Sequence, residues 1–255
     1  MIHSRAWLRV LTPMALHAAD AITTVSAFTR DDLLATYRVR PDRVRVIHPG
    51  AGKPPVPGDA RAAVERFALG DGPVLLTFGV GFANKNIDRL IDAFALVGPQ
   101  RDATLVHVGL PAFEGGAWRE RAEAAGVSDR VRFAGRVDDA TLEDLYAAAT
   151  VVVLPSRFEG FGLPLIEAMR RGVPVASADT TSLPEVGGDA AAWFDPLNVG
   201  AMAETIGGLL DDPARREALV AAGLVRARAF STDHSTGEYV DLYRSLAGRR
   251  RRGAA

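Results

Sequence analysis

Short apolar runs alternate with amphipathic stretches along most of this chain, beginning at Pro73. The apolar runs are rich in β-branched residues and predict strands at residues 74–78, 103–108, 130–133, 150–154 and 173–177. Between them, apolar positions at helical spacing predict helices at residues 86–97, 116–125, 141–148 and 163–171. Strands that alternate with helices form βαβ units, so we predict an α/β fold with a doubly wound parallel sheet. The continuous apolar character of the strands indicates helices on both faces.

The region before the alternating pattern carries weaker signals of the same kind. Residues 5–19 predict an amphipathic helix that is interrupted at Pro13, because proline breaks the helical hydrogen-bond ladder. Strands are predicted at residues 21–25 and 45–48, and Ser26 is placed to cap the helix between them. We therefore expect a second, smaller piece of α/β structure at this end.

A linker and three further helices complete the predicted elements. The segment Lys53–Gly58 is the clearest linker, because its prolines cannot donate to a strand ladder and favour extended backbone. Asp59 is placed to cap a short helix that ends near Leu69. Helices are predicted at residues 200–210, 213–228 and 232–246. The basic run Arg249–Arg252 predicts a solvated, disordered end, which we favour over a contact with a membrane surface.

The stretch with the clearest chemistry is Glu159-Gly-Phe-Gly-Leu-Pro-Leu-Ile-Glu-Ala-Met169, which leads from a strand through a loop into a helix. Pro164 suits the first turn of that helix, where the missing N–H has no intrahelical acceptor to lose. The first amides of a helix lack intrahelical partners and carry the positive end of its dipole. Gly160 and Gly162 let a ligand approach the backbone closely, so a diphosphate would fit at this helix start.

Two carboxylates flank that helix start, at Glu159 in the loop and Glu167 inside the helix. A carboxylate next to a phosphate repels it, so these two make sense only as acceptors of hydrogen bonds from neutral hydroxyls. Sugar and ribose hydroxyls are the obvious donors. The alternative is an ordinary corner with solvated glutamates, which we favour for either glutamate alone but not for the whole stretch.

The same stretch resembles the signature of retaining GT-B glycosyltransferases of the large family 4 group, also called group 1. The resemblance implies that Glu159 contacts the donor sugar and that Glu167 holds the nucleotide ribose. It also implies that the amides of Phe161, Gly162 and Leu163 face the sugar and the diphosphate.

A second glycine-containing loop, Phe78-Gly-Val-Gly-Phe-Ala-Asn-Lys-Asn86, joins the first main strand to its helix. Gly79 and Gly81 permit close backbone approach, and Lys85 offers a point charge near the next helix start. We place the signature about two strands away in the sheet, which makes Lys85 a candidate to neutralise the leaving diphosphate. The glycine spacing does not match a dinucleotide fingerprint, so a nicotinamide-dependent dehydrogenase is disfavoured.

This loop departs from the family pattern at two positions. Many members of the family carry an arginine at the position of Val80 or of Asn84, and both arginines help to bind diphosphate. Fewer cations mean weaker electrostatic stabilisation of the departing nucleotide. Either the helix amides compensate or the activity is reduced.

Further candidates are weaker. The segment Ala134-Gly-Arg-Val137 resembles the family segment that passes the nucleotide base, and Arg136 could also reach phosphate; an ordinary surface arginine is about equally favoured. Val137 is included because those contacts come mainly from backbone. The five histidines show no metal-like spacing, and His107 is read as a satisfied core histidine in an apolar strand. We predict no metal site and no cofactor beyond the nucleotide-sugar co-substrate.

The start of the chain also resembles the family. The string from Ala19 to Leu33, followed by Arg45-Val-Ile-His-Pro-Gly50, is similar to the end of the family's N-terminal domain and its crossing into the C-terminal one. The resemblance implies this division: 1–50, a remnant of the N-terminal acceptor domain; 51–58, a linker; 59–228, a Rossmann-like GT-B C-terminal domain that binds the nucleotide sugar; 229–255, a crossing helix and basic tail. A whole first domain of roughly 150 residues is expected to precede this point. We therefore expect a fragment, or a separate polypeptide that supplies the other half.

Composition limits the classes of protein and of chemistry that fit this chain. The chain has 255 residues with 48% hydrophobic content, enough for a real core, and a formal net charge of −1 that gives no general attraction to nucleic acid. It has no cysteine, which excludes disulfides, thiolate metal sites and thiol nucleophiles. No apolar run approaches the roughly 20 residues that span a bilayer. We expect a cytoplasmic protein, with peripheral binding at the inner face of the membrane as an option.

The resemblance and the residues together lead to one main hypothesis. The chain is the donor half of a glycosyltransferase that moves a sugar from a nucleoside-diphosphate sugar to an acceptor hydroxyl with retention; a mannosyltransferase is one candidate. The acceptor could be a glycan, a lipid-linked molecule or a small molecule, and an N-terminal-half partner or a homo-oligomer could complete the site. The alternative is a non-catalytic or truncated module that binds a nucleotide sugar and cannot transfer it.

Overall fold

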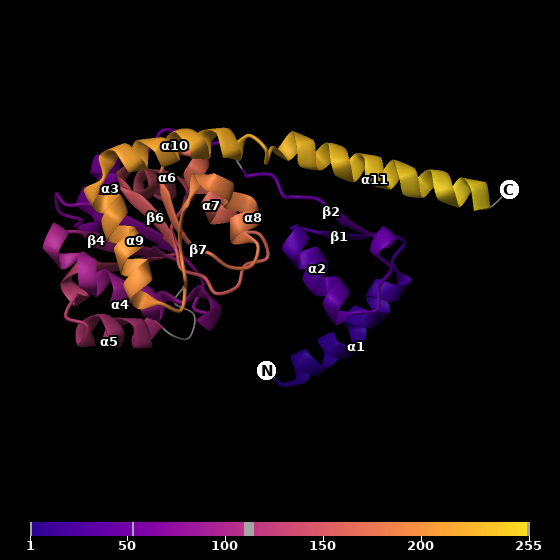
Figure 1. Ribbon diagram of the computed structural model, residues 1–255, viewed down its shortest axis with the longest axis horizontal. Helices are drawn as coiled ribbons and strands as arrows, with labels where there is room; N and C mark the ends of the chain where they lie inside the picture. The colour runs from indigo at the N-terminus through magenta and orange to yellow at the C-terminus, as the bar shows by residue number, and fades with distance from the viewer. Residues whose placement is uncertain (1, 53, 110–114, 254–255) are drawn as a thin grey trace. The chain divides into compact units, whose positions relative to one another are not determined.

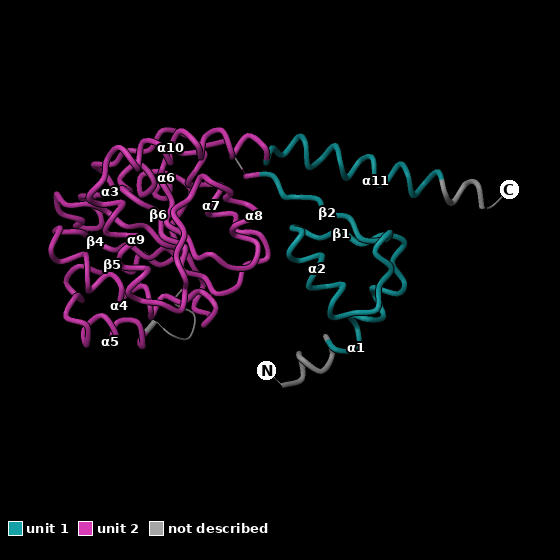
Figure 2. The backbone as a smooth tube through the Cα atoms, viewed as in Figure 1, with its two compact units in different colours: residues 1–50, 230–255 teal, residues 51–229 magenta. Residues whose placement is uncertain are grey.

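A computed structural model describes residues 2–52, 54–109 and 115–253 of the chain. It contains two compact units, of which the larger comprises residues 51–229 and the smaller residues 1–50 with 230–255 (Figure 2). The larger unit contains the main sheet and the candidate site.

The described part of the larger unit forms one six-stranded, entirely parallel sheet. Its strands are β3 (Val74–Phe78), β4 (Thr104–Val108), β5 (Val131–Gly135), β6 (Val151–Leu154), β7 (Val175–Ala178) and β8 (Ala192–Phe194). Their spatial order is β5-β4-β3-β6-β7-β8. The chain thus builds outward from β3 to β5, returns to the other side of β3, and builds outward again to β8. This is the doubly wound order, with its switch point between β3 and β6.

Helices cover both faces of this sheet. They are α3 (Ala60–Phe67), α4 (Ile87–Val97), α5 (Gly115–Ala124), α6 (Asp139–Ala148), α7 (Leu163–Arg170), α8 (Leu183–Gly187), α9 (Val199–Asp211) and α10 (Pro213–Ala227). Short 3-10 turns lie at Ala83–Lys85, Pro99–Arg101, Ser128–Arg130 and Gly188–Ala190. Helix α4 packs against α5 and α9, whereas α3 packs against α6 and α7 against α10 (Figure 1).

The side chains of adjacent strands show that α5 and α6 lie on opposite faces of the sheet. Thr77 and His107 are register partners, so they share one face, and the His107 ring meets Trp118 of α5. Phe78, the next residue, points to the other face and meets Tyr146 of α6. The central strands are buried between the two layers, as in Leu76 and Val152, both 0% exposed. The predicted α/β architecture is therefore confirmed.

The smaller unit consists of short elements and one long helix. They are α1 (Ile2–Ala18), β1 (Ile22–Thr24), α2 (Ala27–Thr36), a 3-10 turn at Pro41–Arg43, β2 (Val44–Val46) and α11 (Thr232–Gly253). β1 and β2 pair in parallel. Ser26 caps α2 as predicted, accepting from the Thr29 N–H at 3.0 Å. No helix among the described residues combines the length and the apolar character needed to cross a bilayer.

Two local predictions were wrong, and one strand was not predicted. Helix α1 continues through Pro13, and the Arg43 guanidinium donates to carbonyls at its C-terminal end, including that of Leu16 at 3.1 Å. The run Arg249–Arg252 lies within α11, whereas the sequence predicted a disordered end there. The edge strand β8 was not predicted, since three residues are too short for a periodicity signal.

Candidate active site at the switch point of the sheet

Most of the predicted site residues lie in the loops that follow β3 and β6. These strands are neighbours, so the Lys85 loop and the signature loop lie next to each other and not two strands apart as predicted. The loop after β3 leads into α4, and the loop after β6 leads into α7. In doubly wound sheets the crevice that binds ligands opens at this point.

Lys85 and Glu159 form an ion pair across the two loops. Lys85 Nζ lies 2.6 Å from Glu159 Oε1, and the two side chains are 22% and 20% exposed. Gly79 makes room for the lysine stem, because a Cβ atom there would lie 3.1 Å from Lys85 Cγ. Gly81 is buried in the same loop. The two residues predicted to carry the chemistry therefore contact each other directly.

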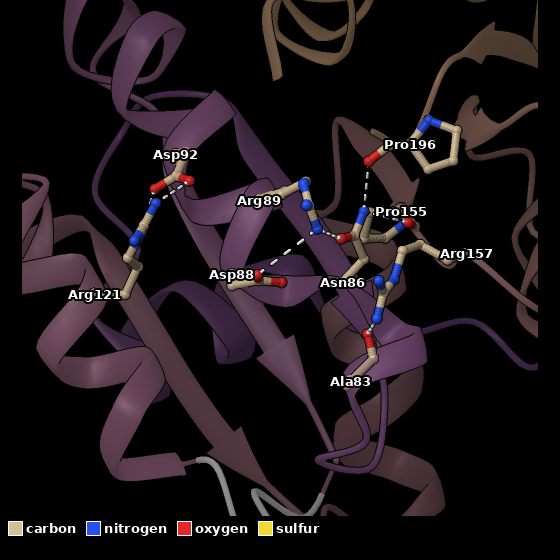
Figure 3. A network of polar contacts seen from close by, with 9 residues as sticks. All are labelled: Ala83, Asn86, Asp88, Arg89, Asp92, Arg121, Pro155, Arg157 and Pro196. Carbon is tan, nitrogen blue, oxygen red and sulfur yellow. Dashed lines mark hydrogen bonds and ion pairs between the residues drawn. The ribbon is translucent and has the colours of Figure 1, made fainter. Parts of the chain in front are cut away.

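Asn86 fastens three loops together beside this pair (Figure 3). It is 1% exposed, and its backbone is left-handed, with φ 58° and ψ 31°. Its side-chain amide donates to the carbonyls of Pro155 at 3.0 Å and Pro196 at 2.8 Å, and its oxygen accepts from Arg89 Nη1 at 3.0 Å. Asn86 thus connects the start of α4 to the loops that follow β6 and β8.

Asn84 and Arg157 add further links between the β3 and β6 loops. Asn84 Nδ2 donates to the Phe158 carbonyl at 3.1 Å, and the Arg157 N–H donates to the Asn84 carbonyl at 2.8 Å. Arg157 Nη2 donates to the Ala83 carbonyl at 2.7 Å (Figure 3). Asn84, which stands where many family members carry an arginine, serves here to hold the loops together. Val80, the other departure, is 42% exposed and carries no charge.

The start of α7, after the loop that follows β6, offers backbone N–H groups as hydrogen-bond donors. Its N-cap Gly162 has φ 100°, and no side chain in the described ranges caps the helix. Pro164 has no N–H, and the Leu165 N–H donates to the Gly162 carbonyl at 3.0 Å. The candidate anion donors in this turn are therefore the N–H groups of Gly162 and Leu163. The Phe161 side chain is only 5% exposed and packs into the core, whereas Leu163 is 41% exposed.

Glu167 lies deeper, within a buried polar cluster. Tyr146 Oη donates to Glu167 Oε2 at 3.4 Å. Arg171 pairs with Glu143, its Nε lying 2.8 Å from Glu143 Oε2, and its guanidinium lies 4.5 Å from the centre of the Tyr146 ring. Burial raises the pKa of Glu167, and Arg171 opposes this. Burial also raises the pKa of Tyr146 well above its ordinary value, so the phenol keeps its proton and remains a donor.

Arg136 and Val137 lie apart from this centre. They follow β5, which β4 separates from β3, and Arg136 is exposed. Together with Asp138, Asp139 and Ala140 they line an open concavity of about 700 Å³. No polar contact joins Arg136 to Lys85 or Glu159 in the described part of the chain. The structure therefore brings the two loops together and leaves the predicted base segment on their flank.

His107 is a core residue as predicted, but it is not satisfied. It is 1% exposed, and neither ring nitrogen makes a hydrogen bond to a described residue. Burial lowers the pKa of His107 to about 4; the nearby Gly79 backbone partly opposes this without reaching hydrogen-bond geometry. Within the described ranges no three histidine, aspartate or glutamate side chains gather in a way that could hold a metal ion.

Sequence reasoning missed several residues that shape the site. The Glu159 N–H donates to Thr181 Oγ1 at 3.1 Å, and Ser182 Oγ donates to the Glu159 carbonyl at 2.9 Å. Asn86 and Tyr146 were also missed. Each contacts residues far away in the chain, so only the fold shows the contact; the one local signal was Asn86, an asparagine directly before a helix.

Two family profiles match this chain. The profile of the Glycosyl transferases group 1 covers residues 62–225, and that of Glycosyltransferase Family 4 covers residues 2–51. Together with the sheet order and the loop geometry, they define a domain of the GT-B class. The chain belongs to the glycosyl transferases group 1 family. The resemblance read from the signature is thereby confirmed.

Relatives and solved structures agree with this assignment. The chain is 33% identical to O-antigen chain mannosyltransferase B of Escherichia coli, covering 91% of this chain and 62% of that protein. It is 34% identical to the D-inositol 3-phosphate glycosyltransferase of Xylanimonas cellulosilytica, covering 91% and 58%. Sucrose-phosphate synthase from Thermosynechococcus elongatus aligns with a TM-score of 0.82 at 27% identity, covering 94% and 61%. The chain thus spans about three fifths of the length of these proteins.

The fold is also shared with a structure that contains nucleotide. Anabaena HepE in complex with UDP and glucose aligns with a TM-score of 0.84 at 22% identity, covering 93% of this chain and 66% of that one.

Proposed function

We propose that this chain binds a nucleoside-diphosphate sugar at the switch point and provides the donor side of a retaining glycosyl transfer to an acceptor hydroxyl. The observation that carries the proposal is the Lys85–Glu159 pair, 2.6 Å apart beside the start of α7, in a member of this family. A cation, helix amides and a carboxylate that can accept hydrogen bonds then lie in neighbouring loops at the switch point. The HepE structures with UDP and glucose and with UDP-glucose support the same ligand class.

The roles follow from the chemistry of each group. Lys85 and the N–H groups of Gly162 and Leu163 bind the diphosphate and stabilise the charge that develops when the bond to the sugar breaks. Glu159 accepts a hydrogen bond from a sugar hydroxyl. Glu167, held by Tyr146, accepts from the ribose hydroxyls.

The remaining candidates act through backbone or at the edge of the site. Gly79 and Gly81 keep the loop close to the ligand, and Arg136 and Val137 lie where the base would extend. We assign the neutralisation of the diphosphate to Lys85 and the amides, with no metal ion. Because Glu159 pairs with Lys85, a bound diphosphate competes with that carboxylate for the lysine.

A second candidate is a module that binds the nucleotide sugar without transferring it. The chain spans 62% and 58% of the length of the two relatives named above, so the activity of those whole proteins is not carried over to it as a fact. Both candidates share the donor site and differ in turnover.

Titration of the purified chain with UDP- and GDP-sugars, together with an assay of sugar release or transfer, tests the proposal. We expect saturable binding that is stronger for the sugar nucleotide than for the sugar alone. Turnover by the chain supports the enzyme, whereas binding without turnover supports the module. Failure of every sugar nucleotide to bind a folded chain would refute both.

A further inference from the structure

We propose that Thr181 and Ser182 are positioning residues that fix the orientation of Glu159 toward the donor sugar. This inference rests on the proposed function, because it assigns Glu159 to the sugar. The two residues lie in the loop that follows β7, the strand next to β6, and they were not among the residues predicted from the sequence.

Their contacts hold the Glu159 peptide from both sides. Thr181 Oγ1 accepts from the Glu159 N–H at 3.1 Å, and Ser182 Oγ donates to the Glu159 carbonyl at 2.9 Å. Ser182 is 0% exposed, so this hydroxyl is shielded from water. With the N–H and the carbonyl both held, the direction of the Cα–Cβ bond is set, and only the side-chain torsions are left to adjust.

The backbone at Thr181 is strained, and this is the second observation. Its φ is 55°, a left-handed value that is a genuine outlier for a β-branched residue. The other left-handed non-glycine residues in the described part of the chain are Ala68, Asn86 and Asp102. None of them is β-branched. Such strain clusters at functional sites and persists only where the surrounding structure over-determines it.

The same segment also reaches the start of α7. Leu183 packs against Gly162, where an added Cβ atom would lie 2.7 Å from Leu183 Cδ2. Thr181 and Ser182 therefore contact Glu159, and the next residue, Leu183, contacts the N-cap of α7. We infer that they keep these two parts of the donor site in fixed relation.

Helices α8 and α10 hold the segment 181–183 in place. The Val186 N–H donates to the Ser182 carbonyl at 3.0 Å, which starts α8 directly after the two hydroxyl residues. Arg226 of α10 then donates to the carbonyls of Val186 at 2.9 Å and Glu185 at 2.6 Å. The two hydroxyl residues thus directly precede a short helix that is anchored to a longer one, which suits a positioning role.

Three variants of Thr181 separate the effect of the hydroxyl from that of the backbone strain, and one variant of Ser182 tests the second contact. Thr181→Val keeps the β-branched shape and the strained backbone but removes the hydroxyl. Thr181→Gly removes both the hydroxyl and the strain. Thr181→Ser keeps the hydroxyl and is the matched control. Ser182→Ala removes the second contact and leaves Thr181 intact.

The first measurement does not depend on the proposed function. Amide hydrogen exchange at Glu159 is expected to speed up in Thr181→Val and Thr181→Gly and to stay close to wild type in Thr181→Ser. Unchanged exchange in Thr181→Val would overturn the proposed contact. Thermal unfolding of all variants is followed in parallel; Thr181→Gly is expected to melt no lower than Thr181→Val.

The second measurement tests the functional role. For each variant, affinities for UDP and for UDP-glucose are compared by calorimetry, with GDP and GDP-mannose as the second pair. We expect the preference for the sugar-bearing nucleotide to fall about five- to tenfold in Thr181→Val, Thr181→Gly and Ser182→Ala, while affinity for the plain nucleotide changes less than about twofold. Thr181→Ser should retain the preference.

The outcomes distinguish the two proposals. If the wild-type chain binds none of the four nucleotides, the proposed function fails while the exchange data still decide the Glu159 contact. If the wild-type chain prefers the sugar nucleotide and all the variants prefer it equally, Thr181 and Ser182 do not position Glu159 and this inference is overturned.

Discussion

Replacing Glu159 by glutamine is expected to tighten the binding of a nucleoside diphosphate that carries no sugar. Glu159 Oε1 lies 2.6 Å from Lys85 Nζ, so a diphosphate competes with it for the lysine. With side chains 22% and 20% exposed, solvent screens the pair, and we take its contribution as about 1 kcal/mol. Removing this competition corresponds to about a fivefold gain in affinity. The same substitution removes the charged acceptor proposed for a sugar hydroxyl, so the additional affinity for the sugar nucleotide should fall by about 2 kcal/mol.

Isothermal titration with UDP and UDP-glucose, and with GDP and GDP-mannose, measures both effects on one sample. Lys85→Gln is the matched control, and it should weaken the binding of every diphosphate, because it removes the cation itself. Thermal unfolding checks that both variants fold. If Glu159→Gln binds the plain diphosphate no more tightly than the wild type does, the competition for Lys85 is refuted.

Other substitutions test Glu167 in the polar cluster, His107 in the core and Asn86, which connects the loops. Glu167→Ala should weaken nucleotide binding by about 1.5–3 kcal/mol, because a hydrogen bond to a charged acceptor is lost. The control is Glu204→Ala, at an exposed position of α9, which should leave nucleotide affinity unchanged. Equal nucleotide affinities of the two variants would contradict the assignment of Glu167 to the ribose. The lowered pKa of His107, about 4, means that below about pH 6.5 the unfolded chain binds a proton that the folded chain does not. Stability is therefore full above that pH and falls by about 3 kcal/mol towards pH 4. His107→Phe should flatten this part of the profile in urea unfolding, and an unchanged slope would exclude His107 as its source. Asn86→Gly keeps the left-handed backbone but leaves two buried carbonyls without their donor, at a cost of about 2 kcal/mol in unfolding free energy. Asn86→Ala should lower the unfolding free energy by about 1 kcal/mol more than Asn86→Gly does, because alanine is strained in the left-handed conformation. Identical unfolding free energies for the two variants would refute that reasoning.

Local signals predicted most of the elements. The strand at Val74–Phe78 and the helix that starts at Leu163 lie where the sequence placed them. Asp59 caps its helix as predicted, accepting from the Arg61 N–H at 2.9 Å. These features depend on periodicity, proline and capping residues within a few positions of one another, so the sequence contains the whole signal.

The arrangement of the site could not be read in the same way. Lys85 and Glu159 are 74 residues apart, and their contact follows from the adjacency of β3 and β6, which periodicity does not encode. The hydrogen bonds of Thr181 and Ser182 to the Glu159 backbone depend on the position of β7 beside β6. The signature therefore identified the family and the residue types, whereas the pairings between them came from the order of the strands.

The strain at Thr181 shows why one residue escaped notice. A left-handed φ usually leaves a trace in the sequence as glycine, asparagine or aspartate, as it does at Asn86 and Asp102. Threonine gives no such trace. Holding it there costs on the order of 1–3 kcal/mol, so the residue is visible only once its backbone is known.

The most direct test of the account is a crystal structure of this chain with a bound nucleoside-diphosphate sugar. We expect the diphosphate to lie within hydrogen-bond distance of the Leu163 N–H and of Lys85 Nζ, with Glu159 turned from the lysine to a sugar hydroxyl. A diphosphate bound elsewhere, with the Lys85–Glu159 pair intact and the start of α7 untouched, would contradict the proposed site.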